Sequence, residues 1–254
     1  MFFIDQSPYF VIDVFKLTFL IIRKMFVYFS SAIMTLTFKV MKNILGENDR
    51  IAAENQALFK EKNVYVINLM GSPGAGKTSV LEKTMERLKD KVNMAVIEGD
   101  LFTSKDAERI EKHGVPVIQI NTAGGCHLDA AMIQQTAPQL DLDKLDLLVV
   151  ENVGNLVCPA EFAVGEDEKG VVLSITEGDD KPMKYPLIFK ESAIALLNKV
   201  DLVPFCNFDL KSAEEDIDTL HPGMKVIEVS CTKDQGVDAW CDWLLLRVRA
   251  KQGK

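Results

Sequence analysis

The sequence predicts an α/β protein in which helices cover both faces of a doubly wound, mostly parallel sheet. Short apolar runs alternate with helix-like stretches along most of the 254 residues, which is the order that a parallel sheet requires. The runs are rich in Val, Ile and Leu, as expected of strands covered on both sides. A glycine-rich loop between one run and a helix is the third observation. The sequence contains no internal repeat.

The predicted strands are separated by stretches in which apolar residues recur at helical spacing. The strands are Val64–Leu69, Met94–Glu98, Pro116–Gln119, Leu145–Glu151, Val171–Ile175, Ser192–Asn198 and Lys225–Val229. The helices between and after them are Lys77–Lys91, Ala130–Leu140, Ser212–Thr219 and Val237–Arg249.

Residues 1–40 differ from the rest of the chain, because they are rich in Phe and Ile and carry no recognisable motif. Their longest uncharged run covers residues 25–38, which is shorter than the roughly 18–20 residues of a membrane-spanning helix. They also lack the basic start and small-residue cleavage site of a signal peptide. We expect an upstream extension preceding a natural start at Met41, and the alternative is a membrane anchor.

Residues 41–62 are expected to form an amphipathic helix that packs on the domain or on a partner subunit. Residues 63–254 then form a single domain. The apolar positions of the helix are Ile44, Leu45, Ile51, Ala52 and Leu58.

Charge and cysteine content limit the class of protein. The net charge is −8, which argues against nucleic acid as a partner, since phosphate backbones bind clustered Lys and Arg. The five cysteines are odd in number and contain no CxxC pair, which favours reduced thiols in the cytoplasm.

The stretch GSPGAGKTS, from Gly71 to Ser79, matches the phosphate-binding loop Gly-x-x-x-x-Gly-Lys-Thr and has a strand before it and a helix after it. Lys77 is expected to reach the β and γ phosphates, and the Thr78 hydroxyl to bind Mg²⁺. Backbone N–H groups of the loop are expected to surround the phosphates. The residues expected to bind nucleotide here are Gly71, Ser72, Gly74, Ala75, Gly76, Lys77, Thr78 and Ser79.

The base is predicted from Asn198-Lys199-Val200-Asp201, which follows a predicted strand and resembles the NKxD motif of GTPases. A carboxylate at Asp201 accepts from guanine N1–H and from the 2-amino group, which adenine lacks. Ser230 and Cys231 end the next strand, where GTPases place the loop behind the base. The predicted ligands are therefore GTP and GDP.

Acidic residues end two further predicted strands. Asp100 follows one of them and is expected to bind Mg²⁺ with Thr78. Glu151 ends another, and Glu151-x-x-Gly154 stands where many GTPases carry DxxG. The Gly154 N–H is expected to contact the γ phosphate and to move when that phosphate leaves. We assign catalytic roles to Lys77, Thr78, Asp100, Glu151 and Gly154.

Two thiols and an imidazole form a second group, in which Cys126 and His127 follow one predicted strand and Cys158 follows another. Thiolate and imidazole ligands suit Zn²⁺ or Ni²⁺, and a two-fold dimer would complete the ligand shell. The alternative is that both cysteines are small buried apolar residues.

Six motifs in this order resemble the HypB family of hydrogenase/urease nickel-incorporation GTPases, over about residues 43–250. They are GSPGAGKTS, EGDLFTSKDAER, NTAGGCHLDA, ENVGNLVCPAEF, TEGDDKPMKYP and NKVDL. The resemblance implies the SIMIBI class of P-loop NTPases and a slow, regulatory GTPase that dimerises with nucleotide and helps to load nickel into nickel–iron hydrogenase. It assigns Cys126, His127 and Cys158 as the metal site.

The resemblance further implies two partners, the small nickel carrier HypA and the hydrogenase large-subunit precursor. It does not extend to the CxxCGC motif or the His-rich tract that some members carry, so a nickel-storage role is not expected. The related urease-specific GTPases use Cys-Pro-His, whereas Cys126 and His127 are adjacent. A metal-binding module with a purely structural nucleotide is the alternative from another class.

Communication between the two sites is expected to run through the segment that carries both Gly154 and Cys158. Displacement of Gly154 by the γ phosphate would re-aim the Cys158 thiol. Lys181 is a candidate for contacting phosphate across the dimer. No Gln or Arg stands out as the water-activating group, so a second subunit or partner is expected to supply that charge.

Overall fold

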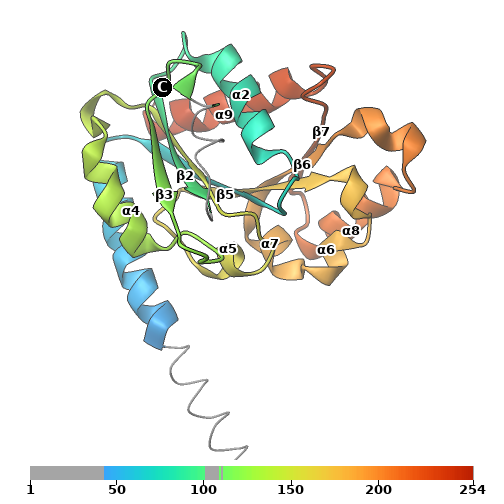
Figure 1. Cartoon of the computed structure of the whole chain (residues 1–254), viewed down its shortest axis with the longest axis horizontal. Helices are drawn as coiled ribbons and strands as arrows, with labels where there is room; N and C mark the ends of the chain where they lie inside the picture. Colours follow the sequence, from blue (N-terminus) through green and yellow to red (C-terminus); the bar gives the residue numbers. More distant parts are fainter. Residues whose placement is uncertain (1–42, 101–108, 110, 254) are drawn as a thin grey trace, which may run out of the picture. The chain divides into compact units, whose positions relative to one another are not determined.

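The computed structural model describes residues 43–100, 109 and 111–253 (Figure 1). The predictions for residues 1–40, as an extension or an anchor, lie outside these residues. Contacts divide the chain after Gly46, and the unit Glu47–Lys254 contains all of the elements below. Within the described ranges, no helix has the length and apolar character required to cross a membrane.

In the described part of the chain, seven strands form one sheet in the order β3-β2-β4-β1-β5-β6-β7, and every neighbouring pair is parallel. The strands are β1 (Tyr65–Gly71), β2 (Met94–Asp100), β3 (Val117–Asn121), β4 (Leu147–Glu151), β5 (Glu168–Ser174), β6 (Ser192–Asn198) and β7 (Lys225–Val229). From central β1 the chain passes to β2 and the edge strand β3, returns to β4 between β2 and β1, and then continues on the other side of β1 through β5, β6 and β7. Doubly wound sheets bind ligands at the carboxyl ends of strands beside such a reversal.

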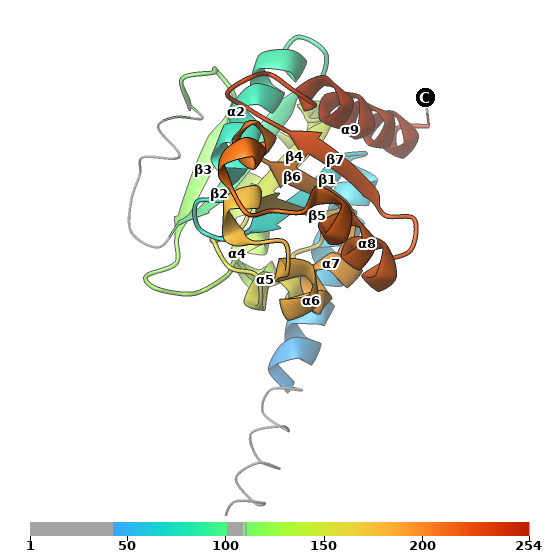
Figure 2. The ribbon, with the colours of Figure 1, turned by 90° about the vertical axis from the view of Figure 1, so that its right-hand side faces the viewer.

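Helices cover both faces of the sheet, as predicted (Figures 1 and 2). The helices are α2 (Lys77–Leu88), α4 (Ala130–Thr136), α5 (Cys158–Glu161), α6 (Lys181–Lys184), α7 (Pro186–Glu191), α8 (Leu210–Leu220) and α9 (Val237–Lys251). Figure 1 shows α2 and α9 together on one side, with α6, α7 and α8 on the other.

The alternation of side chains along β1 explains how both faces become buried. Ile67 and Leu69 belong to the apolar cluster that α2 and α9 cover, whereas Val66 and Met70 belong to clusters on the other face. Successive side chains of a strand point to opposite faces, so an uninterrupted apolar run packs on both sides.

The helix over residues 43–61 packs on the domain from residue 47 onward. Its buried face coincides only in part with the predicted stripe, through Ala52 and the partly buried Leu58. Asn48, Ala52, Asn55 and Phe59 are buried, at the spacing of one helical face. The Asn55 Nδ2 donates to the carbonyl oxygens of Ala130 (2.8 Å) and Val164 (3.0 Å). Apolar periodicity could not identify the whole of this face, because two of its members, Asn48 and Asn55, are polar and donate hydrogen bonds to backbone carbonyls of other segments.

Several element boundaries differ from the prediction. β5 begins at Glu168 rather than at the predicted Val171. The charged Lys169 concealed this start in the sequence, because its burial depends on the hydrogen bond that its side chain donates to the Ala160 carbonyl (2.8 Å). The predicted helix Ala130–Leu140 ends at Thr136 and continues as a 3-10 turn over Ala137–Gln139. Pro138, which lacks an N–H group, ends the α-helical hydrogen bonding there. The predicted helix Lys77–Lys91 is also shorter and ends at Leu88.

Candidate functional site

The glycine-rich loop joins the carboxyl end of β1 to the start of α2, where helix N–H groups point outward. Gly76 caps the helix with a φ of +97°, and a Cβ there would lie 2.3 Å from the Asn198 Nδ2. Both the left-handed backbone and the close approach therefore require glycine. A helix N-terminus reached through such a turn is a ready anion site.

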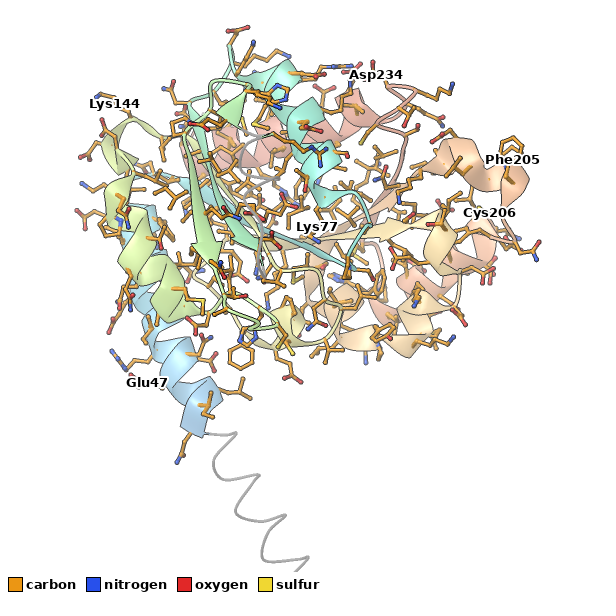
Figure 3. The ribbon with its side chains drawn as sticks, viewed as in Figure 1. Glu47, Lys77, Lys144, Phe205, Cys206 and Asp234 are labelled. Atoms are coloured by element: carbon orange, nitrogen blue, oxygen red, sulfur yellow. The ribbon has the colours of Figure 1, made fainter. Side chains whose placement is uncertain are left out.

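A cavity of about 430 Å³ opens over this loop, and we refer to it as the phosphate cavity. It brings together residues predicted to bind the phosphates, the Mg²⁺ ion and the base, from four separate segments. Those lining it are Gly74, Gly76, Lys77, Thr78, Ser79, Asp100, Glu151, Gly154 and Lys199. The labelled Lys77 lies near the centre of the side-chain view in Figure 3.

Two side chains of the first turn of α2 are buried and directed into this region. Lys77 is 7% exposed, and its Nζ lies 3.2 Å from the Gly71 carbonyl oxygen and 3.4 Å from that of Ser72. Thr78 Oγ1 donates to Glu151 Oε1 at 2.8 Å. A hydroxyl and carboxylates around one cavity are the oxygen donors that Mg²⁺ prefers.

The NKxD residues contact the phosphate loop directly. Asn198 Nδ2 donates to the Ala75 carbonyl (2.9 Å), and Lys199 Nζ donates to the Gly74 carbonyl (2.6 Å). Lys199 adopts a φ of +66°, which turns the chain sharply after β6.

Asp201 lies beyond that turn and is held by the strand end beside it. Ser230 Oγ donates to Asp201 Oδ1 at 2.6 Å. Cys231 is partly buried, and burial raises the pKa of its thiol to about 11, so it is neutral at physiological pH. The structure thus brings Asp201, Ser230 and Cys231 together beside the loop, outside the lining of the phosphate cavity.

Gly154 packs against the same loop from the β4 side. A Cβ on Gly154 would lie 2.8 Å from the backbone Cα and N of Pro73. Such a contact is too short for any other residue, so glycine is what allows the two loops to approach.

The cysteines and histidine of the second predicted group do lie together. Cys126 Sγ is 3.0 Å from Cys158 Sγ and 3.4 Å from His127 Nδ1. The three ligand atoms all lie within 4.8 Å of one another. One ion with bond lengths of about 2.0–2.3 Å can contact all three, so the donor set and its spacing fit a thiophilic metal.

The environment of this cluster shifts two of its pKa values. Burial, opposed by Asp129 and Glu161, holds the pKa of His127 below its ordinary value of 6.5, so the imidazole is neutral and able to donate a lone pair. Burial and then the hydrogen bond with Cys126 raise the pKa of Cys158 above 9.0. The Cys158 thiol is therefore protonated at neutral pH until a cation displaces the proton.

Sequence reasoning missed two asparagines that hold these loops. The Asn152 Oδ1 accepts from the Leu128 N–H (2.9 Å), directly after His127. The Asn155 Nδ2 donates to the Cys126 carbonyl (3.2 Å). Both lie in ENVGN, on either side of Gly154, and polar residues that flank a glycine predicted to contact the γ phosphate were the available signal.

Two basic residues near the predicted site differ in their surroundings. Arg109 lines the phosphate cavity and forms an ion pair with Glu82 in α2, with its Nη2 3.3 Å from Ser79 Oγ. Lys181 lies at the start of α6 with its Nζ 5.3 Å from the centre of the Tyr185 ring. It does not line the phosphate cavity of this chain.

The parallel sheet, the glycine-rich loop and the cavity define a nucleotide-binding domain of the P-loop class. The model of the family described as CobW/HypB/UreG, nucleotide-binding domain, matches residues 65–228. The chain is 50% identical over 202 residues to the hydrogenase maturation factor HypB of Escherichia coli K12, covering 80% of this chain and 70% of that protein.

Two further relatives agree. The probable hydrogenase maturation factor HypB of Methanocaldococcus jannaschii is 42% identical over 199 residues, covering 78% of this chain and 90% of that protein. The crystal structure of HypB from Helicobacter pylori in complex with nickel superposes with a TM-score of 0.77 at 38% identity, covering 80% of this chain and 96% of that chain. The chain belongs to the HypB family of hydrogenase maturation factors, which confirms the predicted resemblance and fold class.

Proposed function

We propose that this protein is a GTP-hydrolysing nickel insertion factor for hydrogenase maturation, in which the metal site responds to the nucleotide. The observation that carries the proposal is the Cys126–Cys158 pair, with sulfurs 3.0 Å apart, on loops from the same sheet edge as the phosphate loop. The HypB of Helicobacter pylori, whose structure is similar, was solved in complex with nickel.

GTP is the nucleotide that the base motif favours. The Asp201 carboxylate offers the acceptor for guanine N1–H and the 2-amino group, and Ser230 fixes its orientation. Thr78 and Asp100 would bind the Mg²⁺ that accompanies the phosphates, with Glu151 beside them. Lys77 and the Gly154 N–H would contact the β and γ phosphates. These roles are supported by one shared cavity.

Nickel is the cargo rather than a resident cofactor. The Cys126 and Cys158 thiolates and the His127 imidazole are soft and intermediate donors that suit Ni²⁺ and equally accept Zn²⁺. Cys126 is exposed, so an ion held there is accessible to a donor or an acceptor protein. Three ligands leave the shell incomplete, and a nucleotide-dependent homodimer would complete it.

The expected partners follow from the family. A HypA-type nickel carrier would supply the ion, and the hydrogenase large-subunit precursor would receive it. Hydrolysis would make the transfer directional, because GTP and GDP stabilise different positions of the Gly154 segment.

The proposal is tested by titrating Ni²⁺ and Zn²⁺ into the full-length chain loaded with GDP or with a non-hydrolysable GTP analogue. Wild type is compared with Cys126→Ala and Cys158→Ala. Cys206→Ala is the matched control, because it removes a thiol distant in sequence from the cluster. We expect both cluster variants to lose the thiolate-to-nickel absorption band and the control to keep it.

GTP turnover in the same samples separates the proposal from the alternative of a structural nucleotide. A Lys77→Ala variant that binds metal while hydrolysing GTP as fast as wild type would exclude the assigned GTPase site. Thiolate-independent metal binding would instead exclude the metal site and leave the GTPase assignment standing.

A further inference from the structure

The backbone of Asn155 is attached to the first residue of the phosphate loop. Its N–H donates to the Gly71 carbonyl oxygen at 3.0 Å, and the two residues form an isolated antiparallel bridge. The same carbonyl oxygen lies 3.2 Å from the Lys77 Nζ. One acceptor is thus shared between the lysine predicted to bind phosphate and the segment that follows Gly154.

The side chain of Asn155 forms hydrogen bonds with the backbone of both segments that carry the cysteines of the metal cluster. Its Nδ2 donates to the Cys126 carbonyl at 3.2 Å, and its Oδ1 accepts from the Val157 N–H at 2.9 Å. Val157 is the N-cap of α5, the helix that begins at Cys158. A single residue therefore contacts the backbone of both segments that carry thiols.

Asn152 contributes a fixed point beside this link. It is 1% exposed, its Oδ1 accepts from Leu128 N–H and its Nδ2 donates to Asn68 Oδ1 at 3.1 Å. Asn68 lies within β1 and is fully buried. The His127 side of the cluster is thereby anchored to the sheet, whereas the Cys126 and Cys158 segments are joined through the half-buried Asn155.

We propose that Asn155 is the positioning residue through which the phosphate loop sets the geometry of the Cys126–Cys158 pair. This inference rests on the proposed function. When Lys77 turns from the Gly71 carbonyl to a phosphate, that oxygen keeps the Asn155 N–H as a partner, and the Gly71–Asn155 bridge changes. The Asn155 amide carries the change to the Cys126 carbonyl and to the start of α5, which alters the spacing of the two sulfurs.

The test uses the full-length chain with Ni²⁺ as the probe. Nickel affinity and the thiolate-to-nickel absorption band are measured with GDP and with a non-hydrolysable GTP analogue, for wild type and Asn155→Ala. Asn93→Ala is the matched control, since Asn93 is an exposed asparagine before β2, at the opposite end of that strand from the cavity. Thermal unfolding and binding of a fluorescent GDP analogue check that each variant is folded.

In wild type we expect the two nucleotide states to differ in nickel affinity by about 5- to 150-fold, the usual range for linked sites. In Asn155→Ala the absorption band remains, but it no longer shifts between nucleotides. The nickel affinities of the two nucleotide states then differ by less than about twofold. Asn93→Ala behaves as wild type. Asn155→Asp keeps the acceptor for the Val157 N–H and lacks the donor for the Cys126 carbonyl. It should therefore lose the nucleotide dependence of nickel affinity as well. This variant keeps the test decisive if Asn155→Ala fails to fold.

The outcomes distinguish this inference from the proposed function. If Asn155→Ala and Asn155→Asp both keep the wild-type difference in nickel affinity between the two nucleotide states, the role of Asn155 is overturned and the proposed function stays intact. The absence of that difference in wild type overturns the link between the sites, and the role of Asn155 with it. Loss of thiolate binding in wild type overturns the metal site itself.

Discussion

Thr78 Oγ1 donates a 2.8 Å hydrogen bond to Glu151 Oε1, so the first turn of α2 and the end of β4 meet at one point of the phosphate cavity. Thr78 is 7% exposed and Glu151 is 4% exposed. A hydroxyl oriented by a buried carboxylate presents its lone pairs in a fixed direction, which is what a cation ligand requires. This pair links the fold to the proposed magnesium chemistry.

Replacing Thr78 with Val should weaken the dependence of nucleotide binding on Mg²⁺. The variant keeps the shape of the side chain and removes the hydroxyl, whose hydrogen bonds to charged groups contribute about 1.5–3 kcal/mol, or roughly 10- to 100-fold in affinity. Mg²⁺ titrations with a fluorescent GDP analogue measure the change. Thr219→Val removes a hydroxyl from exposed α8 as a control. Unchanged Mg²⁺ dependence in Thr78→Val would contradict the assignment.

Replacing Gly154 with Ala should slow GTP hydrolysis roughly 100-fold, the size of effect expected from a displacement of about 1 Å at a reacting group. The added Cβ would lie 2.8 Å from the Pro73 backbone and push the two loops apart. Single-turnover hydrolysis of GTP is the measurement. Gly46→Ala is the control, because a Cβ there meets nothing within 4 Å. Equal rates in both variants would show that Gly154 does not act on the phosphate.

Replacing Asp201 with Asn should reduce affinity for GDP by about 10- to 100-fold, because a charge-assisted acceptor for two guanine donors is lost. Affinity for xanthosine diphosphate should rise, since its 2-oxo group accepts a hydrogen bond from the new amide. Competition binding with both nucleotides measures the ratio. A variant that still preferred GDP to the same degree would place base selection elsewhere.

Nickel affinity should rise with pH between about 6.5 and 8.5. The raised pKa of Cys158 means that its thiol is protonated throughout this window, so each proton that the metal displaces adds about tenfold in affinity per pH unit. The lowered pKa of His127 keeps the imidazole neutral above 6.5, and it adds no slope there. Isothermal titration of the wild-type protein at three pH values gives the slope. A flat profile in wild type would mean that thiolates do not bind the metal.

Replacing Asn55 with Leu should destabilise the domain by about 2–4 kcal/mol, since two buried carbonyls, those of Ala130 and Val164, lose their donor. Urea unfolding measures the change in the free energy of unfolding. Lys60→Ala, on the exposed side of the same helix, should change it by less than about 0.5 kcal/mol. A stable Asn55→Leu would mean that apolar contacts alone hold this helix.

The fold could be predicted because β6 and β7 are apolar runs bounded by polar residues, and the structure reproduces both predicted ranges, Ser192–Asn198 and Lys225–Val229. The start of β5 could not, because Lys169 is buried through a contact with Ala160 that forms only in the tertiary structure. The short helices α6 and α7, each with proline at its start, contain too few residues for a helical period to be recognised.

The position of the glycine-rich loop between β1 and α2 could be predicted because its motif depends on local spacing, and its binding of phosphate stays a prediction. The sequence also placed Cys126 and Cys158 on strand-end loops, which made their meeting plausible. Their 3.0 Å separation and the contacts of Asn155 depend instead on how two loops approach across the sheet edge. No local pattern specifies that distance.

The two hydrogen bonds from Asn198 and Lys199 to the phosphate loop separate two tasks within the NKxD motif. Within one four-residue motif, Asp201 is the residue that we propose binds the base, whereas Asn198 and Lys199 donate hydrogen bonds to the loop that we propose binds phosphate. A substitution of Asp201 leaves both hydrogen bonds to the loop in place, whereas a substitution of Asn198 or Lys199 removes one of them. The choice of base can therefore be changed at one position without disturbing the loop.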